Sequence, residues 1–249
     1  MAEGIFEGRT AVVTGGARGI GRAICRMLAA NGAQVAINYE RNETAARETL
    51  ALLDAAAGQA IIIQADVARR DQVERMMSTV RERLGGVDLL VNNAAIAKNA
   101  PHAKLTFADW KRMFEVNVDG PFLTTWAVKD DMIKRRYGRI VNVSSLAAVA
   151  LKKDMIHYAT SKAAVIAFTR HCAASFAPFN VRVNCVAPGL TNTELAQSSN
   201  PGLVEQIISA TPMGRMAEPS EIASVVKFLL SEDSGFVTGQ TVVACGGRT

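Results

Sequence analysis

Near the N-terminus the sequence reads Thr10-Ala-Val-Val-Thr14-Gly-Gly-Ala-Arg-Gly19-Ile-Gly21. The apolar, β-branched start of this stretch predicts a buried strand. Residues 22–30 follow the glycines with apolar side chains at positions 24, 27 and 28, a helical spacing. Strand, glycine turn and helix in this order are typical of dinucleotide binding, because glycines admit a pyrophosphate close to the backbone and the helix N-terminus attracts it. The spacing is G-x-x-x-G-x-G rather than the usual G-x-G-x-x-G.

Further apolar runs alternate with segments of helical periodicity along the rest of the chain. We expect strands at 34–38, 60–64, 87–91, 138–143, 181–187 and 240–244 and helices at 44–57, 71–84, 106–132, 158–174 and 218–231. This alternation predicts a single-domain Rossmann fold over residues 1–249, with a doubly wound seven-stranded parallel sheet and helices on both faces. Residues 190–217 form the longest irregular region, and we expect them to cover the substrate.

The composition is that of a globular protein, with 49% hydrophobic and 20% charged residues. No apolar run is long enough to span a bilayer, and the N-terminus carries acids without an apolar core, so we expect a cytoplasmic protein with no membrane contact. A net charge of +5 favours anionic ligands, but the cations are scattered, which argues against nucleic-acid binding. The cysteines and histidines lack metal-ligand spacing, so no metal is expected.

A candidate proton-transfer pair lies at Tyr158 and Lys162, which leave the same face of a helix at i and i+4. A nearby ammonium stabilises a phenolate and would lower the tyrosine pKa from about 10 toward the working range. Ser145, after the fifth strand, could hold a substrate oxygen. Asp66 and Asn93 follow other strands, where ligands bind in such sheets, although turn formation explains an acid or amide there equally well.

Residues after the second strand bear on the choice of cofactor. An acid at this position would hold the ribose hydroxyls of NAD(H) and repel a 2′-phosphate, but the expected position is occupied by Tyr39. Arg18 and Arg41 suit phosphate recognition and favour NADP(H). Glu40 favours NAD(H) instead, so the choice between the two cofactors stays open.

Taken in order, these motifs make the chain resemble the short-chain dehydrogenase/reductase superfamily along nearly its whole length. The resemblance adds the adenine-contacting pair Asp66-Val67, an N-N-A-G-like motif at 92–95 ending in Ala95, and the nicotinamide segment Pro188-Gly189 with Thr191. It also implies a catalytic tetrad of Asn117, Ser145, Tyr158 and Lys162. The candidate cofactor contacts are Gly15, Arg18, Gly19, Ile20, Gly21, Tyr39, Arg41, Asp66, Val67, Asn93, Ala94, Ala95, Tyr158, Lys162, Pro188, Gly189 and Thr191.

The resemblance implies hydride transfer between a nicotinamide and a ketone or secondary alcohol. Tyr158 would exchange the proton of the substrate oxygen, Lys162 would lower the Tyr158 pKa and bind the nicotinamide ribose, Ser145 would polarise the substrate, and Asn117 would hold a relay water. Within the superfamily the likeness is to 3-oxoacyl-acyl carrier protein reductases. Members of the family usually form tetramers, so a homotetramer is expected.

One departure from these reductases leaves the substrate open. Of the two arginines that those reductases present to their carrier, Arg136 is present and Phe179 replaces the other. NAD-dependent oxidation of a small secondary alcohol, sugar or cyclic alcohol therefore remains an alternative. A dinucleotide-binding scaffold without activity is disfavoured by the complete tetrad.

Overall fold

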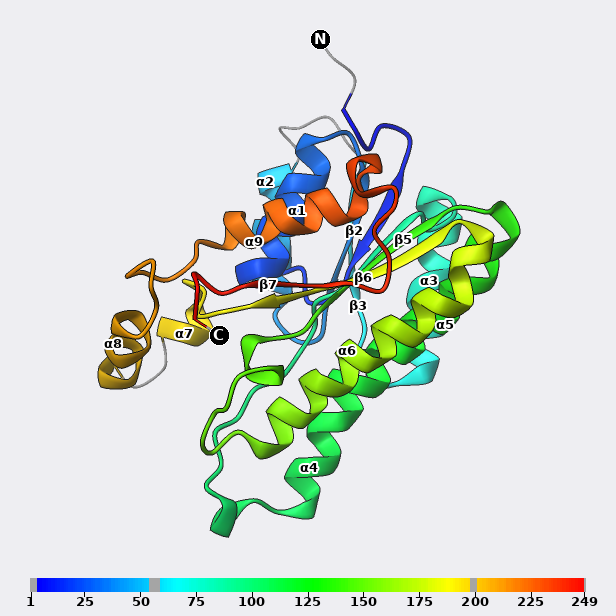
Figure 1. The fold of residues 1–249 in the computed structure, drawn as a ribbon. Helices are drawn as coiled ribbons and strands as arrows, with labels where there is room; N and C mark the ends of the chain where they lie inside the picture. The colour runs from blue at the N-terminus through cyan, green and yellow to red at the C-terminus, as the bar shows by residue number, and fades with distance from the viewer. Residues whose placement is uncertain (1–3, 54–58, 198–200, 249) are drawn as a thin grey trace.

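A seven-stranded parallel sheet forms the centre of the protein (Figure 1). The structure is a computed structural model that describes residues 4–53, 59–197 and 201–248. The strands lie in the order β3-β2-β1-β4-β5-β6-β7, which confirms the predicted doubly wound Rossmann fold. Their bounds are β1 Thr10–Val13, β2 Gln34–Tyr39, β3 Ala60–Gln64, β4 Leu89–Asn92, β5 Gly138–Val143, β6 Val181–Pro188 and β7 Thr241–Ala244.

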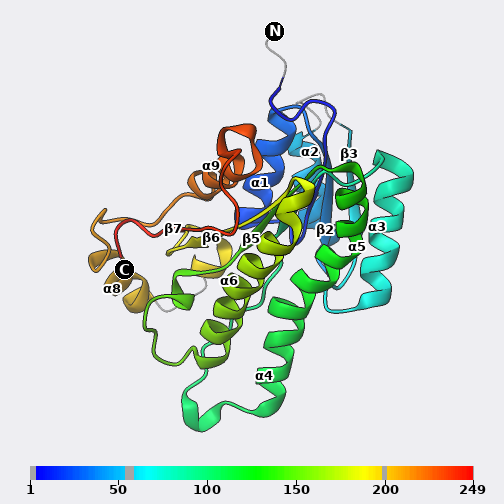
Figure 2. The same cartoon turned by 45° about the vertical axis from the view of Figure 1, so that its right-hand side comes forward.

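Helices cover both faces of this sheet (Figures 1 and 2). One face carries α1 (Gly19–Ala30), α2 (Glu43–Leu53) and α9 (Pro219–Leu230), and the other carries α3 (Arg70–Leu84), α5 (Gly120–Arg135) and α6 (Ile156–Phe176). Because neither face meets solvent, the strands are mostly apolar, and every residue of β4, β5 and β6 is buried. None of the described helices is both long and apolar enough to cross a membrane.

The topology places a crevice at the carboxyl end of β1. Here the chain order reverses, since β1 pairs with β2 on one side and with β4 on the other. Loops after neighbouring strands therefore turn to opposite faces and leave room for a ligand between them. The expected site residues follow these strand ends.

The long helix expected at 106–132 is interrupted. It consists of α4 (Phe107–Phe114), a π-helical turn (η3, Glu115–Asp119) and α5. A capping box between Thr106 and Asp109 starts α4, which packs beside the first half of α6 beyond the edge of the sheet (Figure 2). The helix expected at 44–57 ends as α2 at Leu53, and the rest of that range lies outside the described residues.

The region expected to be an irregular loop at 190–217 contains two short helices, so that part of the prediction was wrong. These are α7 (Glu194–Gln197) and α8 (Pro201–Ser209), and residues 198–200 lie outside the described part of the chain. The region is anchored at both ends, because Asn192 N–H donates to Ala217 O at 2.8 Å and Ala217 N–H donates to Leu190 O at 3.0 Å. It thus forms a helical flap whose two ends are hydrogen-bonded to each other.

Candidate active site

A cavity of about 690 Å³ opens at the carboxyl ends of the strands. It is lined by every cofactor contact that the sequence suggested and by three of the four tetrad residues, Ser145, Tyr158 and Lys162. Asn117 is the exception, since it is fully buried behind the wall. Residues far apart in the sequence are thus brought to one site by the sheet topology.

The glycine turn after β1 fits a pyrophosphate. Gly15 and Gly19 have φ values of 61° and 53°, a left-handed conformation that other residues rarely adopt. A Cβ on Gly21 would lie 2.2 Å from Gly15 O, so no larger residue fits there. The first turn of α1 has no side-chain cap, which leaves backbone N–H groups free for an anion at the positive end of the helix.

Two side chains that the sequence did not single out hold this turn in place. Thr14 Oγ1 accepts hydrogen bonds from the N–H groups of Asn93 and Ala94 at 2.9 and 3.0 Å. The buried Asn38 accepts from Gly15 N–H at 3.2 Å and donates to Ala65 O at 3.0 Å. Asn93 itself donates to Thr14 O and Gly15 O, both at 3.0 Å. The amide of Asn93 therefore fastens the turn to the end of β4.

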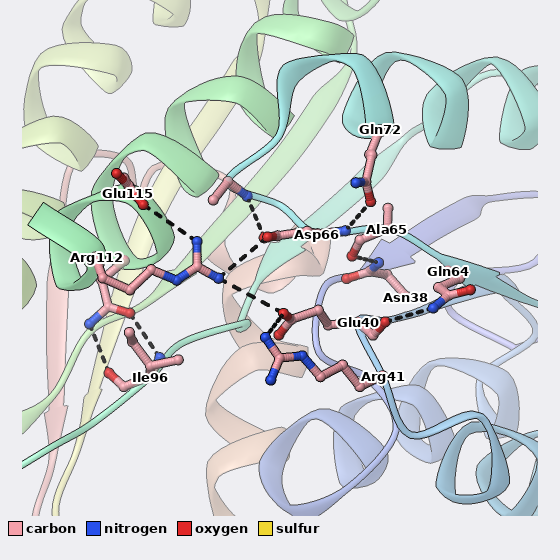
Figure 3. A network of polar contacts seen from close by, with 12 residues as sticks. Asn38, Glu40, Arg41, Gln64, Ala65, Asp66, Gln72, Ile96, Arg112 and Glu115 are labelled. Atoms are coloured by element: carbon pink, nitrogen blue, oxygen red, sulfur yellow. Dashed lines mark hydrogen bonds and ion pairs between the residues drawn. The ribbon is translucent and has the colours of Figure 1, made fainter.

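An ion-pair network centred on Arg112 crosses the adenosine end of the cavity (Figure 3). Arg112 reaches from α4 to Asp66 Oδ2 at 3.3 Å, to Glu115 at 3.5 Å and to Glu40 at 3.8 Å. Asp66 also accepts from Ala68 N–H at 2.9 Å. Arg112 was not predicted as a site residue, because it joins residues from three segments that are separate in the sequence.

Glu40 has a second cationic partner in Arg41, at 3.0 Å. Its carboxylate is therefore shared between two guanidinium groups (Figure 3). The Arg41 side chain is 84% exposed and lines the cavity together with Arg18 and Tyr39. Glu40, the acid that directly follows β2, therefore lies between the positive charges of Arg41 and Arg112.

The proton-transfer pair lies on α6 as the spacing predicted. Lys162 is 3% exposed, and its Nζ donates to Val143 O at 2.8 Å and lies 6.0 Å from the centre of the Tyr158 ring. Ser144 Oγ donates to Lys162 O at 2.8 Å, which ties α6 to the end of β5. Ser145 follows at the start of a 3₁₀ turn, where its Oγ accepts from Ala147 N–H at 3.2 Å.

Burial dominates the titration of both groups. It raises the pKa of Tyr158 above the usual 10, and a hydrogen bond with Ser145 lowers it in part. Burial also lowers the pKa of Lys162 from 10.5 to about 8. The sequence predicted that Lys162 would lower the Tyr158 pKa, but in the protein alone desolvation outweighs that effect.

Asn117 lies buried behind the residues that line the cavity. Its Oδ1 accepts from Ile96 N–H at 2.9 Å, and its Nδ2 donates to Ile96 O at 3.0 Å and to Ser161 Oγ at 3.1 Å. The side chain thus connects the π-helical turn to the cavity-lining segment after β4 and to α6 beside Lys162. Asn117 does not line the cavity itself, so its expected part in the catalytic tetrad and the relay water near it stay predictions.

Among the residues that the structure describes, no cluster of three or more histidine, cysteine or acidic side chains could hold a metal ion. The cavity instead combines an anion-binding helix N-terminus, an adenosine end lined with polar and charged groups, and a hydroxyl pair beside a buried ammonium. Such a set can bind a dinucleotide and exchange a proton with a substrate oxygen next to it.

Comparison with known proteins agrees with this architecture. The family model described as short chain dehydrogenase matches residues 9–203. A 3-oxoacyl-[acyl-carrier-protein] reductase of Synechocystis sp. is 37% identical over 96% of both chains. An acetoacetyl-CoA reductase of Allochromatium vinosum is 37% identical over 96% of this chain and 98% of its own.

A solved structure from Brucella melitensis shares the whole fold. It is a 3-oxoacyl-[acyl-carrier protein] reductase with bound NAD, 35% identical, with a TM-score of 0.90 over 98% of this chain and 92% of its own. The chain therefore belongs to the short chain dehydrogenase family and is an oxidoreductase that uses a nicotinamide dinucleotide.

Proposed function

We propose that the protein reduces the ketone of a 3-oxoacyl thioester with NADPH. The observation that carries this proposal is the placement of Ser145, Tyr158 and Lys162 in one cavity with the glycine turn after β1. The bound nicotinamide supplies the hydride. Reductases of 3-oxoacyl and acetoacetyl thioesters are also among the relatives that match nearly the whole chain.

The side chains divide the remaining work. Ser145 Oγ holds the ketone oxygen, and the Tyr158 hydroxyl passes its proton to that oxygen as the alcohol forms. The raised pKa of Tyr158 keeps the phenol protonated at neutral pH, which suits a proton donor and hence the reductive direction. Lys162, whose pKa of about 8 leaves it mostly charged at neutral pH, stabilises the phenolate left behind.

The preference for NADPH is supported by the charges after β2. Glu40 would repel a 2′-phosphate, but its carboxylate contacts Arg41 at 3.0 Å and Arg112 at 3.8 Å. Arg18 also lines this end of the cavity and has no acidic partner among the described residues. The local balance therefore favours an additional phosphate.

Fluorescence titration with NADPH and NADH tests this preference. We expect NADPH to bind about tenfold tighter or more, a difference of about 1.4 kcal/mol. Arg41→Gln should remove most of that difference without weakening NADH binding. Arg47→Gln is the control, because Arg47 is a similarly exposed arginine that pairs with Glu43 on α2 and does not line the cavity. Tighter binding of NADH would refute the proposed preference.

The form of the thioester follows from the surface at Arg136. Arg136 donates to Pro178 O at 3.0 Å, and the second position is occupied by the 38% exposed Phe179. This surface presents a single arginine to an acidic carrier protein, and that arginine is already hydrogen-bonded to Pro178 O. We therefore propose a free acyl thioester as the substrate. The test compares NADPH oxidation with acetoacetyl-CoA and with acetoacetyl carrier protein. A strong preference for the carrier form would refute this choice.

We further propose a homotetramer in which the long helices pair across an interface. Phe122 and Trp126 of α5 are 41% and 43% exposed, their rings stack at 4.3 Å, and Phe168 of α6 lies beside them. Adjacent exposed rings of this kind are typical of a contact surface. Light scattering should show that Trp126→Glu reduces the molecular mass in solution, whereas Leu52→Glu, an equally exposed site on α2, leaves it unchanged.

Two further expectations stay proposals. We propose that the flap at 190–217 covers the substrate, because Leu190, Leu203 and Ile207 line the cavity. We also propose a cytoplasmic location, which fits the presence of four free cysteines.

A further inference from the structure

Two cationic side chains that line the cavity belong neither to the expected cofactor contacts nor to the expected catalytic tetrad. Lys152 lies on the loop between Ser145 and Tyr158, and Arg248 lies in the segment that follows β7. Both line the same cavity as Tyr158. Within the described part of the chain, neither side chain has an ion pair or a hydrogen bond. The proposed reaction gives neither of them a role.

The backbone after β7 delivers Arg248 to this position. Gly246 and Gly247 have φ values of 64° and 89°, which turn the chain after the strand. Arg248 N–H donates to Cys245 O at 3.3 Å, and Met213 N–H donates to Gly246 O at 3.1 Å. The segment thus runs from the sheet to the flap that carries α7 and α8 (Figure 1). Arg248 is held there by a specific turn and not by an extended tail.

Acids are absent from this end of the cavity within the described residues. Elsewhere the cavity is lined by the acidic residues Glu40, Asp66 and Glu194. Glu40 and Asp66 contact Arg112, and Glu194 lies beside Gly19. Lys98 also lines the cavity, but it is paired with Asp109 at 2.6 Å. Apart from the arginines proposed to bind the cofactor phosphate, Lys152 and Arg248 are therefore lining cations that stay available for a ligand.

The two cations also act on each other. The pKa of Lys152 is lowered mainly by desolvation and, to a smaller extent, by the positive charge of the Arg248 guanidinium. Two like charges in one cavity repel each other, and an anion bound by both would turn that repulsion into attraction. Arginine and lysine both bind oxyanions through charge-assisted hydrogen bonds.

Apolar side chains line the same cavity as these cations and the reacting hydroxyls. They include Ala147, Ala150, Met155, Leu203, Val204 and Ile207. A substrate that fits would carry its ketone at Ser145 and Tyr158, an apolar or acyl portion along these walls, and a charged group at the far end.

We infer that Lys152 and Arg248 form a subsite for an oxyanion, a phosphate or a carboxylate, carried by the substrate at the end remote from its ketone. The inference rests on the proposed function, because it needs the ketone to be placed at Tyr158. It assigns these two residues to substrate selection and gives them no part in hydride or proton transfer.

Matched substrate pairs test this subsite. One pair is acetoacetyl-phosphopantetheine and acetoacetyl-pantetheine, and the other is the 1-monomethyl and the dimethyl ester of 3-oxooctanedioate, in which the free carboxylate of the monoester lies remote from the ketone. We expect the wild-type kcat/KM to favour the charged member of at least one pair by about tenfold, or about 1.4 kcal/mol. The pair that shows this preference identifies phosphate or carboxylate as the bound group. Added salt should reduce the preference.

The variants Lys152→Gln and Arg248→Gln should each reduce the preference for the charged member while the kcat/KM of the neutral member stays within about twofold. Lys153→Gln is the matched control, because Lys153 is adjacent and exposed but does not line the cavity. Equal use of charged and neutral members by the wild type would overturn the inference. So would an equal loss on both members in the variants.

A binding measurement separates this inference from the proposed function. Calorimetry in the presence of NADP⁺ compares phosphopantetheine with pantetheine and acetate with acetamide, which need no turnover. Tighter binding of a charged probe, lost in Lys152→Gln and Arg248→Gln, would support the subsite even if no ketone were reduced. Binding of the charged probes that the two variants leave unchanged would overturn it.

Discussion

Replacing Lys162 by methionine should change how stability depends on pH. Lys162 is 3% exposed, and burial lowers its pKa from 10.5 to about 8. A pKa difference of one corresponds to about 1.4 kcal/mol, so the folded state disfavours the charged ammonium by about 3 kcal/mol relative to the unfolded chain. Methionine has a similar length and no charge, and it removes this cost.

The direction of the effect follows from proton binding. Below about pH 8 the lysine is protonated in both states, and the full cost is present. Between about pH 8 and pH 10.5 the unfolded chain holds the proton and the folded chain does not, so the free energy of unfolding rises with pH. The wild type should therefore gain about 2 to 3 kcal/mol relative to Lys162→Met between pH 7 and about pH 10.

Urea unfolding of both proteins without cofactor, at several pH values and one protein concentration, measures this difference. Groups that titrate identically in the two proteins cancel in the comparison. Lys153→Met, at an exposed position, should show no pH-dependent difference from the wild type. A difference between Lys162→Met and the wild type that stays constant from pH 7 to pH 10 would refute the argument that burial controls Lys162.

Three further substitutions address the site. Tyr158→Phe should lower kcat by about 10²- to 10⁴-fold while NADPH binding by fluorescence is retained, and near-normal turnover would contradict its role as proton donor. Gly21→Ala places a Cβ 2.2 Å from Gly15 O. We expect it to weaken NADPH binding and to lower stability by about 1 to 3 kcal/mol in calorimetry, whereas Gly86→Ala meets only the end of the Arg135 side chain at 3.3 Å and should be tolerated. Asn117→Ala leaves the N–H and C=O of Ile96 without their partner. It should lower the free energy of unfolding by about 1 to 3 kcal/mol for each group and also reduce kcat. An unchanged melting temperature would show that these hydrogen bonds contribute nothing to stability.

The sheet was predictable because its strands are buried on both faces. Segments such as 138–143 and 181–187 are therefore rich in apolar and β-branched residues, although each also holds a buried arginine and a buried asparagine, and they form β5 and β6. The glycine turn was predictable for a similar local reason, since strand, turn and helix are contiguous. The expected cofactor contacts accordingly all line the cavity.

Features that depend on contacts between distant segments could not be predicted. The π-helical turn interrupts an otherwise regular helix, and Asn117 in that turn bonds to Ile96 and Ser161, which lie 21 and 44 residues away. Arg112 contacts Asp66 across 46 residues. Neither contact produces a periodic pattern in the sequence. The helix boundary and the partners of Glu40 are therefore known only from the three-dimensional structure.

The pKa values of the two buried groups of the active site are shifted in opposite directions. Burial raises the pKa of Tyr158 and lowers that of Lys162 to about 8, so Lys162 is the first of the pair to lose its proton as the pH rises. An alkaline fall in kcat/KM for NADPH near pH 8 would then report Lys162 and not the phenol. Lys162→Arg should move that fall to higher pH, because a guanidinium stays charged throughout this range. A fall that stays at the same pH in this variant would assign the titration to Tyr158 and would show that the lysine charge does outweigh burial.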